Sequence, residues 1–290
     1  MDYKIILAAK VELAKAFKET NDVYATVEAE YGDTVIEGTH VTLAHHCGPY
    51  ANHPAPCCRE DIEKAPEGST ILVSHIDLDT VGGCLALMGL KAELCTKEFW
   101  DGAGYIDTSG PHRLGELDTL VRRQLQACYA WEADNTVVVS PIKVTDVTEH
   151  ILKYGKAIEA IGNRDVHLLS RGDARVAAEQ RALEKRLIEE CPRVRVYAST
   201  AADGFTPAGY YSPKYEQIIP ATVTFNTETK AITIAFEDGG KKTSARDLVT
   251  NIWGPDAGGH PGIAGSPRGQ EMSLHDLLRA VTAVRNSFEK

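Results

Sequence analysis

The side chains best suited to chemistry form a short motif, His75-Ile76-Asp77-Leu78-Asp79. Alternate residues of an extended chain point the same way, so one imidazole and two carboxylates would share a side. This donor set suits Mn²⁺ or Mg²⁺, and a divalent cation lowers the pKa of water so that hydroxide becomes available as a nucleophile near neutral pH. Alternatively, the two aspartates cap a helix that begins near Thr80, and His75 is a hydrogen-bonded structural side chain.

A second candidate site is the stretch AGGHPGIAGSPRG over residues 257–269. Gly258 and Gly259 let backbone amides approach an anion closely, and His260 and Arg268 add donors. We therefore expect this stretch to bind a phosphate group. The alternative is a surface loop, rich in glycine and proline, that has no ligand.

A third group of ligand-type side chains follows the short apolar run Val41–Ala44. It consists of His45, His46, Cys47, His53, Cys57 and Cys58. Three interpretations stay open. If the sheet is rearranged, His45 and His46 reach the same site as the first motif. The histidines and cysteines could instead bind Zn²⁺, although they lack the standard paired spacing, or the segment is a loop with scattered histidines.

Asp107 and His112 are a further candidate pair of ligands. The run Gly104–Ile106 is predicted to be a short strand that ends in Asp107, and His112 follows five residues later. If this strand neighbours the first motif, the pair contributes to the metal site. The alternative is a turn built by Ser-Gly-Pro, with Asp107 as its cap.

The elements that must position these residues alternate between strand and helix patterns. Ser69–Val73 is predicted to be a buried strand and Val81–Leu94 a helix, which is half of a parallel α/β unit; such units bind ligands outside the carboxyl ends of their strands. The other predicted strands are 104–106, 136–144 and 194–198, and the predicted helices are 11–31 (one or two), 117–129, 147–160 and 175–191. This alternation predicts an α/β fold with a doubly wound, mainly parallel sheet.

A connection rich in Gly, Pro and Tyr near 203–213 predicts a domain boundary. We expect an α/β domain over residues 1–205 and a smaller α+β domain over residues 214–290. Within the second, 221–226 and 231–236 predict a β-hairpin, and 244–252 and 273–288 predict helices on either side of the glycine-rich stretch. Ser273 is the expected N-cap of the last helix, with Asp276 in its first turn.

Two motifs resemble those of the DHH phosphoesterase superfamily. Residues 71–79, followed by Gly82-Gly83, are similar to its first metal motif. Gly258-Gly259-His260-Pro261, followed by Ala264-Gly265, is similar to the signature of the DHH-associated C-terminal domain, so the resemblance covers roughly residues 70–290. It implies an Mn²⁺- or Mg²⁺-dependent phosphohydrolase with a catalytic cleft between two domains.

The resemblance also implies roles for individual residues. His75, Asp77 and Asp79 would bind the metal, and Gly258, Gly259, His260 and Arg268 would hold the substrate phosphate. With the further candidates included, the expected catalytic residues are His75, Asp77, Asp79 and His112, and the expected metal ligands are His75, Asp77, Asp79, Asp107, His45 and His46.

The sequence departs from the family at the third metal motif, because no Asp-His-His tripeptide follows the first motif. Ala44-His45-His46 is similar to it, but Ala44 replaces the aspartate and the tripeptide precedes the first motif. Two alternatives to a Mn²⁺- or Mg²⁺-dependent enzyme therefore remain. One is a non-catalytic relative that binds a nucleotide, and the other is a zinc-dependent hydrolase that uses the N-terminal His/Cys loop.

Composition narrows the choice of partners. The net charge of −10 argues against a long nucleic-acid duplex, whose binding is driven by counterion release from a broad basic surface. The seven cysteines are an odd number at irregular spacing, and no apolar run is long enough to span a bilayer. We therefore expect a cytoplasmic protein with reduced cysteines, no membrane partner, and a small phosphorylated molecule or short oligonucleotide as substrate. A homodimer is the assembly that we consider.

Overall fold

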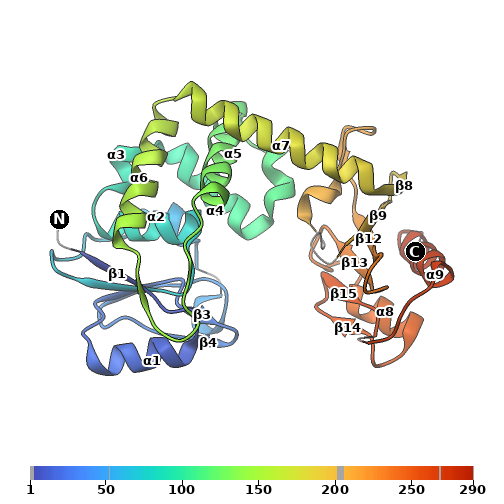
Figure 1. Cartoon of the computed structure of the whole chain (residues 1–290), viewed down its shortest axis with the longest axis horizontal. Helices are drawn as coiled ribbons and strands as arrows, with labels where there is room; N and C mark the ends of the chain where they lie inside the picture. The colour runs from blue at the N-terminus through green and yellow to red at the C-terminus, as the bar shows by residue number, and fades with distance from the viewer. Residues whose placement is uncertain (1–2, 52, 201–205, 268, 290) are drawn as a thin grey trace. The chain divides into compact units, whose positions relative to one another are not determined.

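The computed structural model describes residues 3–51, 53–200, 206–267 and 269–289 (Figure 1). The chain divides into two compact units, Met1–Val176 and Ala177–Lys290. The division falls inside one long helix, α7 (Val166–Arg186). It lies earlier in the chain than the domain boundary expected between residues 205 and 214, because two strands that precede residue 205 pair within the second sheet.

The sheet of the first unit confirms the expected α/β class. Its order is β5 (Val41–Leu43), β2 (Ala25–Val27), β6 (Thr70–Val73), β1 (Lys4–Leu7), β7 (Thr145–Asp146). The first four are parallel, and β7 is antiparallel to β1. Because parallel strands run in one direction, the carboxyl ends of β5, β2 and β6 meet at one edge of the sheet, which is where ligands bind in this class of fold.

Helices cover both faces of this sheet (Figure 1). Helix α1 (Val11–Thr20) packs on one face, where Ala14 meets Ile6 and Leu72. The opposite face packs Ile5 and Ile71 against the remaining helices. These helices are α2 (Leu78–Leu87), α3 (Lys91–Leu94), α4 (Lys97–Ser109), α5 (Thr119–Asp134) and α6 (Thr148–Gly162). Neighbouring residues of β1 thus serve opposite faces, which is the alternation of a strand buried on both sides.

Short elements fill the connections of the first unit. Strands β3 (Glu30–Tyr31) and β4 (Thr34–Val35) form a small antiparallel pair. The described residues of this unit contain three 3₁₀ helices, η1 (Gly48–Tyr50), η2 (Pro56–Cys58) and η3 (Pro111–Glu116). The segment with η2 lies against α2 and α4, where Gly82 and Gly104 leave room for it. A Cβ on Gly82 would lie 2.5 Å from Cys57 Cβ, and a Cβ on Gly104 would lie 2.7 Å from Cys58 Sγ.

The second unit contains a mixed sheet, and two helices pack on one of its faces. Its order is β14 (Gly258–Gly259), β15 (Ile263–Gly265), β13 (Ile232–Phe236), β12 (Ala221–Asn226), β9 (Val194–Ser199), β8 (Leu187–Cys191). Only the β9–β12 pair is parallel. Helices α8 (Ala245–Trp253) and α9 (Leu274–Ser287) pack on it through residues that include Val249 and Leu277. The described part also contains η4 (Pro207–Tyr210) and the pair β10 (Tyr211–Ser212) and β11 (Gln217–Ile218).

Several predicted elements of the second unit are present. The hairpin is β12–β13, and both flanking helices lie where the sequence places them. Ser273 is the N-cap of α9 and forms a capping box with Asp276, as expected from their spacing.

Four secondary-structure predictions were wrong. Residues 104–106 lie inside α4, whose N-cap Thr96 accepts a hydrogen bond from the Phe99 amide. The glycines that suggested a strand there allow close helix packing instead. The described residues 136–144 contain no strand. Residues 25–27 and 30–31 were predicted to be helical but are strands. The helix that was predicted to reach residue 191 ends at Arg186, before β8. None of the described helices is long and apolar enough to cross a membrane.

Candidate metal centre

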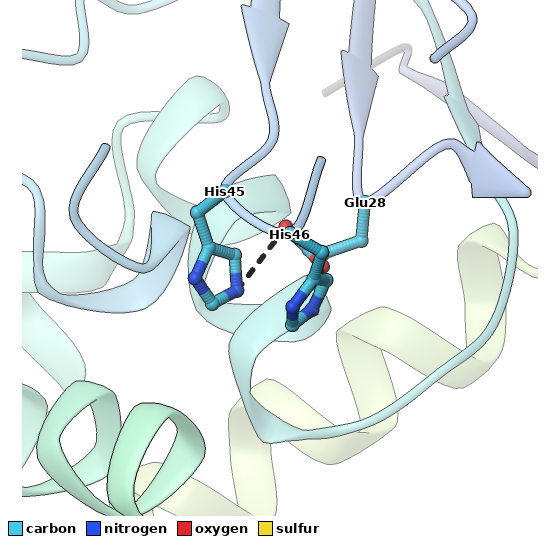
Figure 2. A group of neighbouring side chains, drawn as sticks. All are labelled: Glu28, His45 and His46. Atoms are coloured by element: carbon cyan, nitrogen blue, oxygen red, sulfur yellow. Dashed lines mark ion pairs between the residues drawn. The ribbon is translucent and has the colours of Figure 1, made fainter. Parts of the chain in front are cut away.

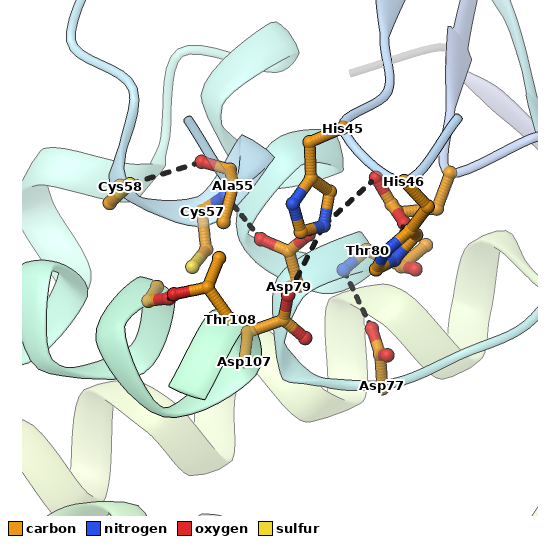
Figure 3. Close-up of polar contacts among 12 residues, drawn as sticks. His45, His46, Ala55, Cys57, Cys58, Asp77, Asp79, Thr80, Asp107 and Thr108 are labelled. Atoms are coloured by element: carbon orange, nitrogen blue, oxygen red, sulfur yellow. Dashed lines mark hydrogen bonds and ion pairs between the residues drawn. The ribbon is translucent and has the colours of Figure 1, made fainter. Parts of the chain in front are cut away.

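Five ligand-type side chains converge at the carboxyl edge of the first sheet (Figure 2 and Figure 3). Glu28 directly follows β2, and His45 and His46 follow β5. Asp79 lies in the first turn of α2, just after β6, and Asp107 lies on α4. They form two overlapping groups, Glu28 with His45 and His46, and His45 with Asp79 and Asp107. Within each group the ligand atoms lie within 4.8 Å of one another.

His45 is common to both groups and is the most enclosed member, with 3% of its side chain exposed. Its Nε2 lies 3.1 Å from Asp107 Oδ2, 3.4 Å from Asp79 Oδ2 and 3.6 Å from Glu28 Oε1. Burial lowers the pKa of His45, but the close carboxylates of Asp107 and Asp79 and the charge of Glu28 outweigh it and raise the pKa to about 10. One ring nitrogen carries a single hydrogen, so it cannot satisfy three carboxylates.

Glu28 is a buried carboxylate that the sequence analysis did not identify. It is 1% exposed, and its Oε2 lies 2.8 Å from His46 Nε2, whose side chain is half-exposed. Burial, followed by the charge of Asp79, raises the pKa of Glu28 to about 9. Its backbone φ is 50°, in the left-handed region that few residues other than glycine adopt. The available signal was an acidic residue directly after the apolar run Ala25–Val27.

Asp79 is held in the cluster by the segment that contains η2. Its side chain is 2% exposed, and its Oδ1 accepts a hydrogen bond of 2.7 Å from the backbone amide of Cys57. Burial raises the pKa of Asp79, although the nearby His45 imidazole and the hydrogen bond from the Cys57 amide oppose the shift. Asp79 therefore has a tertiary environment that a helix cap would not require.

His75 and Asp77 lie outside both groups. The His75 Nε2 pairs with Asp77 Oδ2 at 3.0 Å, and both side chains are about a third to a half exposed. Asp77 Oδ1 accepts from the Thr80 amide at 2.8 Å, so Asp77 is the N-cap of α2 (Figure 3). The capping alternative thus applies to Asp77 and not to Asp79. The expected metal and catalytic roles of His75 and Asp77 stay predictions.

Glu30 fixes the turn that carries the two clustered histidines, and it was also missed from the sequence. Its carboxylate accepts hydrogen bonds from the backbone amides of His45, His46 and Cys47, at 3.1, 3.1 and 3.0 Å. The Cys47 thiol donates to the same carboxylate at 3.3 Å. Burial opposes ionisation of Glu30, but these donors outweigh it and lower its pKa. No spacing rule links residue 30 to residues 45–47.

His112 is not brought into the cluster by the described structure. It lies in η3, where its ring is next to Gly110. Burial lowers the pKa of His112 to about 4, so this imidazole is neutral near pH 7. Neither candidate group contains it, whereas Asp107, its expected partner, belongs to one. The catalytic role of His112 stays a prediction.

The cysteines of the N-terminal segment do not gather around a common point. The Cys47 thiol contacts Glu30, and the Cys58 thiol donates to the carbonyl oxygen of Ala55 at 3.2 Å. Burial raises the pKa of Cys57 well above its usual value. Across the described residues, both candidate groups contain only His, Glu and Asp.

The glycine-rich stretch lines a cavity in the second unit. The cavity has a volume of about 1320 Å³, and Gly258 and Gly259 line it together with Arg246, Asn251 and Ser266. A Cβ on Gly259 would lie 2.6 Å from Ala264 Cα, so this glycine permits β14 to pair closely with β15. His260 is exposed at the turn between these strands. Arg268 lies outside the described residues.

The donor set of the cluster fits a divalent cation. Among the described residues, Glu28 Oε1, His45 Nε2 and Asp79 Oδ2 are buried and have no hydrogen-bond partner of good geometry. Buried carboxylates are costly unless a positive charge or hydrogen-bond donors balance them. Carboxylate oxygens with two imidazoles suit Mn²⁺, and they also accommodate Mg²⁺ or Zn²⁺. Each orphaned atom could serve as a ligand to such an ion.

Comparisons with known proteins give structural similarities only. No family model matches the sequence, and no match was found among curated proteins. Among solved structures, the chain is similar to the pGpG-specific phosphodiesterase PggH from Vibrio cholerae, at 10% sequence identity and a TM-score of 0.48, with 95% of this chain and 87% of that chain covered.

Two further solved structures are similar to the chain. One is an exopolyphosphatase-related protein from Bacteroides fragilis, at 13% identity and a TM-score of 0.38, with 96% of this chain and 74% of that chain covered. The other is RecJ from Thermus thermophilus in complex with Mn²⁺, at 13% identity and a TM-score of 0.39, with 97% and 47% covered.

Proposed function

We propose that this chain is a metal-dependent phosphohydrolase that acts on a small phosphorylated molecule or a short oligonucleotide. The observation that carries the proposal is the environment of His45, whose Nε2 lies within 3.6 Å of carboxylate oxygens from Glu28, Asp79 and Asp107. These three acids come from different segments, and the single charge of a protonated His45 would not balance three ionised carboxylates. We propose that one or two Mn²⁺ or Mg²⁺ ions are held there.

The residues of the cluster would act mainly as ligands. Glu28, Asp79 and Asp107 would supply oxygen ligands, and His45 and His46 would supply nitrogen ligands. When bound, a divalent cation stabilises negative charge on phosphoryl oxygens and lowers the pKa of water. The half-exposed side chain of His46 marks the side from which a phosphate group would approach.

His75 is the side chain best placed for proton transfer beside the cluster. The hydrogen bond to Asp77 raises the pKa of His75 although burial opposes the shift, so His75 holds a proton more firmly than a free imidazole. Ser74 Oγ lies 2.8 Å from His75 Nδ1 and orients the ring. We propose that His75 and Asp77 either bind a second ion or donate a proton to the leaving oxygen, as a histidine–carboxylate pair can.

The proposed substrate class follows from charge. A net charge of −10 disfavours long nucleic acids, whereas a bound cation still attracts a single phosphate group. Gly258 and Gly259 line a cavity of the second unit in which the backbone is accessible, and we propose that it binds a phosphate group. A small phosphorylated molecule or a short oligonucleotide is therefore the substrate class that we propose.

The test is metal content together with hydrolysis. Protein purified without chelator should contain Mn²⁺ or another divalent ion, and should release p-nitrophenol from bis(p-nitrophenyl) phosphate and mononucleotides from a dinucleotide. Asp79→Asn should lose both the metal and the activity. Asp101→Asn is the matched control, because Asp101 is exposed on α4 and pairs with Lys97.

The outcome separates three functions. Hydrolysis that requires Mn²⁺ or Mg²⁺ supports the proposal. Nucleotide binding with no metal and no hydrolysis indicates the non-catalytic relative instead. Zinc that is retained in Asp79→Asn but lost in a Cys57→Ser/Cys58→Ser variant indicates the zinc-dependent alternative.

A further inference from the structure

The first unit contains a cavity beside η2, α3 and α4. None of the five side chains of the metal cluster lines it. Its volume is about 470 Å³, within the range of small-molecule sites. Trp100 is buried and forms part of the wall. The lining residues used below are Arg59, Ile62, Ala86, Lys91, Ala92 and Trp100.

The cavity contains a cation without an acidic partner. Arg59 and Lys97, the other two cations that line it, pair with carboxylates, the first with Asp61 at 2.7 Å and the second with Glu60 and Asp101 at 2.8 and 2.9 Å. In the described part of the chain, Lys91 pairs with no carboxylate. Its ammonium donates instead to the carbonyl oxygens of Cys57, at 2.9 Å, and Arg59. An ammonium has three hydrogens, so one donor remains for an anion.

The rest of the wall is suited to a flat apolar group. Trp100 is fixed because its indole Nε1 donates to the Lys91 carbonyl at 3.3 Å. The Lys91 Nζ lies 6.0 Å from the centroid of the Trp100 ring, so charge and aromatic surface are adjacent. Ile62 and Ala86 add apolar surface. An anionic group on a planar apolar body would meet both features at once.

Cys57 links this cavity directly to the metal cluster. Its carbonyl oxygen accepts a hydrogen bond from Lys91, and its amide donates to Asp79 Oδ1 at 2.7 Å. An anion bound to Lys91 would hold the ammonium, and with it the backbone of Cys57, in this position. Asp79 would then be held as well, so metal and anion should favour each other's binding.

We propose that this cavity is a regulatory site for a small molecule that carries a carboxylate or phosphate on a planar apolar body, and that its occupancy strengthens metal binding at the cluster. The effect on metal binding rests on the proposed function, because it requires a metal ion bound near Asp79. Binding of a ligand in the cavity does not depend on the proposed function.

The first experiment measures occupancy by ¹⁹F NMR on metal-free protein that contains 5-fluorotryptophan. The sequence has three tryptophans, so each gives its own resonance, and Trp100→Phe assigns the one at the cavity. The probes are benzoate and phenyl phosphate. We expect one or both to shift the Trp100 resonance in a saturable way; the active probe distinguishes a carboxylate from a phosphate ligand.

Two variants test the role of Lys91 in that experiment. Lys91→Met should weaken binding of the probe by about tenfold or more, because it removes a charge-assisted hydrogen bond. Lys97→Met, which removes a more exposed cation of the same cavity, should leave the affinity for the probe unchanged. Ala92→Phe fills the cavity from an exposed position without changing Lys91, and it should also abolish binding. An unmoved Trp100 resonance with both probes, or equal binding by the Ala92→Phe protein, overturns the site.

The second experiment measures Mn²⁺ affinity by EPR with and without the active probe at saturation. We expect about fivefold tighter Mn²⁺ binding with the probe, and no change in Lys91→Met. Equal Mn²⁺ affinities with and without the probe would overturn the proposal that the cavity regulates metal binding. If no Mn²⁺ binds at all while the Trp100 resonance still responds, the proposed function and the regulation fail together, and the binding site remains.

Discussion

The Nε2 of His45 lies 3.1 Å from Oδ2 of Asp107, a contact between the segment that follows β5 and the last turn of α4. Both side chains also face Asp79, whose Oδ2 lies 3.4 Å from the same nitrogen. This contact closes the second group of ligands and brings α4 into the candidate centre. It leads to the first of four predictions.

Asp107→Asn should weaken Mn²⁺ binding by about 10- to 100-fold and abolish most hydrolysis, because an amide is a poorer ligand than a carboxylate and leaves the buried His45 with less charge compensation. Isothermal titration calorimetry measures the affinity. Asp101→Asn on the same helix should bind Mn²⁺ as the unmodified protein does. Equal affinities for the two variants would exclude Asp107 as a ligand.

Glu30→Gln should also weaken Mn²⁺ binding, by about tenfold, although Glu30 is not in either group of ligands. The amide retains one acceptor oxygen, but its NH₂ cannot accept from the backbone amides of His45–Cys47. Loss of this support misplaces the two histidines, and outer hydrogen bonds of this kind typically contribute 10- to 100-fold in metal affinity.

The matched control for Glu30 is Asp33→Asn, which removes an exposed acid three residues further along the chain. It should change the affinity little. If both variants bind Mn²⁺ equally well, Glu30 supports the fold of the turn without positioning its histidines.

Glu132→Gln should change how stability depends on pH in the metal-free protein. Burial, followed by the charge of Asp77, raises the pKa of Glu132 from its usual 4.5 to about 7. The folded protein therefore holds more protons than the unfolded chain between these pH values, and the free energy of unfolding falls as pH rises through them. Above pH 7 the buried Glu132 is ionised in the folded protein, and the loss of stability from its ionisation is complete. Below pH 4.5 Glu132 is protonated in both states, and this loss is absent.

The Glu132→Gln protein avoids this cost, so its free energy of unfolding should exceed that of the unmodified protein at pH 8 by roughly 2 kcal/mol. The two should be nearly equal at pH 4. Urea unfolding at both pH values measures the difference. Exposed Glu149→Gln should show no such pH-dependent gain, and a gain equal at both pH values would contradict the assignment to ionisation.

Gly104→Ala should destabilise the first unit by about 1–3 kcal/mol through overpacking. Its added Cβ would lie 2.7 Å from Cys58 Sγ and 2.8 Å from Cys58 Cβ, both of which lie close to the backbone of η2. Thermal unfolding checks the shift. Gly115→Ala has nothing within 4 Å and should be close to neutral, so equal effects of the two changes would contradict the packing argument.

Much of the fold followed from local pattern. The buried strand before His75, the helix whose first turn contains Asp79, the C-terminal hairpin and the capping box of Ser273 with Asp276 all depend on residues close in sequence. Hydrophobic periodicity and capping chemistry act over a few residues, so a single sequence displays them. Gly104–Ile106 was misassigned because its glycines serve a tertiary contact and not a local turn.

The sequence by itself determined which segments carry ligand-type side chains, and it placed Asp79 and His45 at the ends of strands. Only the tertiary structure decided that they meet. Strand order β5-β2-β6 puts Glu28 between the two histidines and the first motif, and backbone pairing, which local sequence does not encode, sets that order. The position of Asp107 depends on how closely α4 packs against η2. Ligands from distant segments converge because long-range packing, not spacing along the chain, sets their distances.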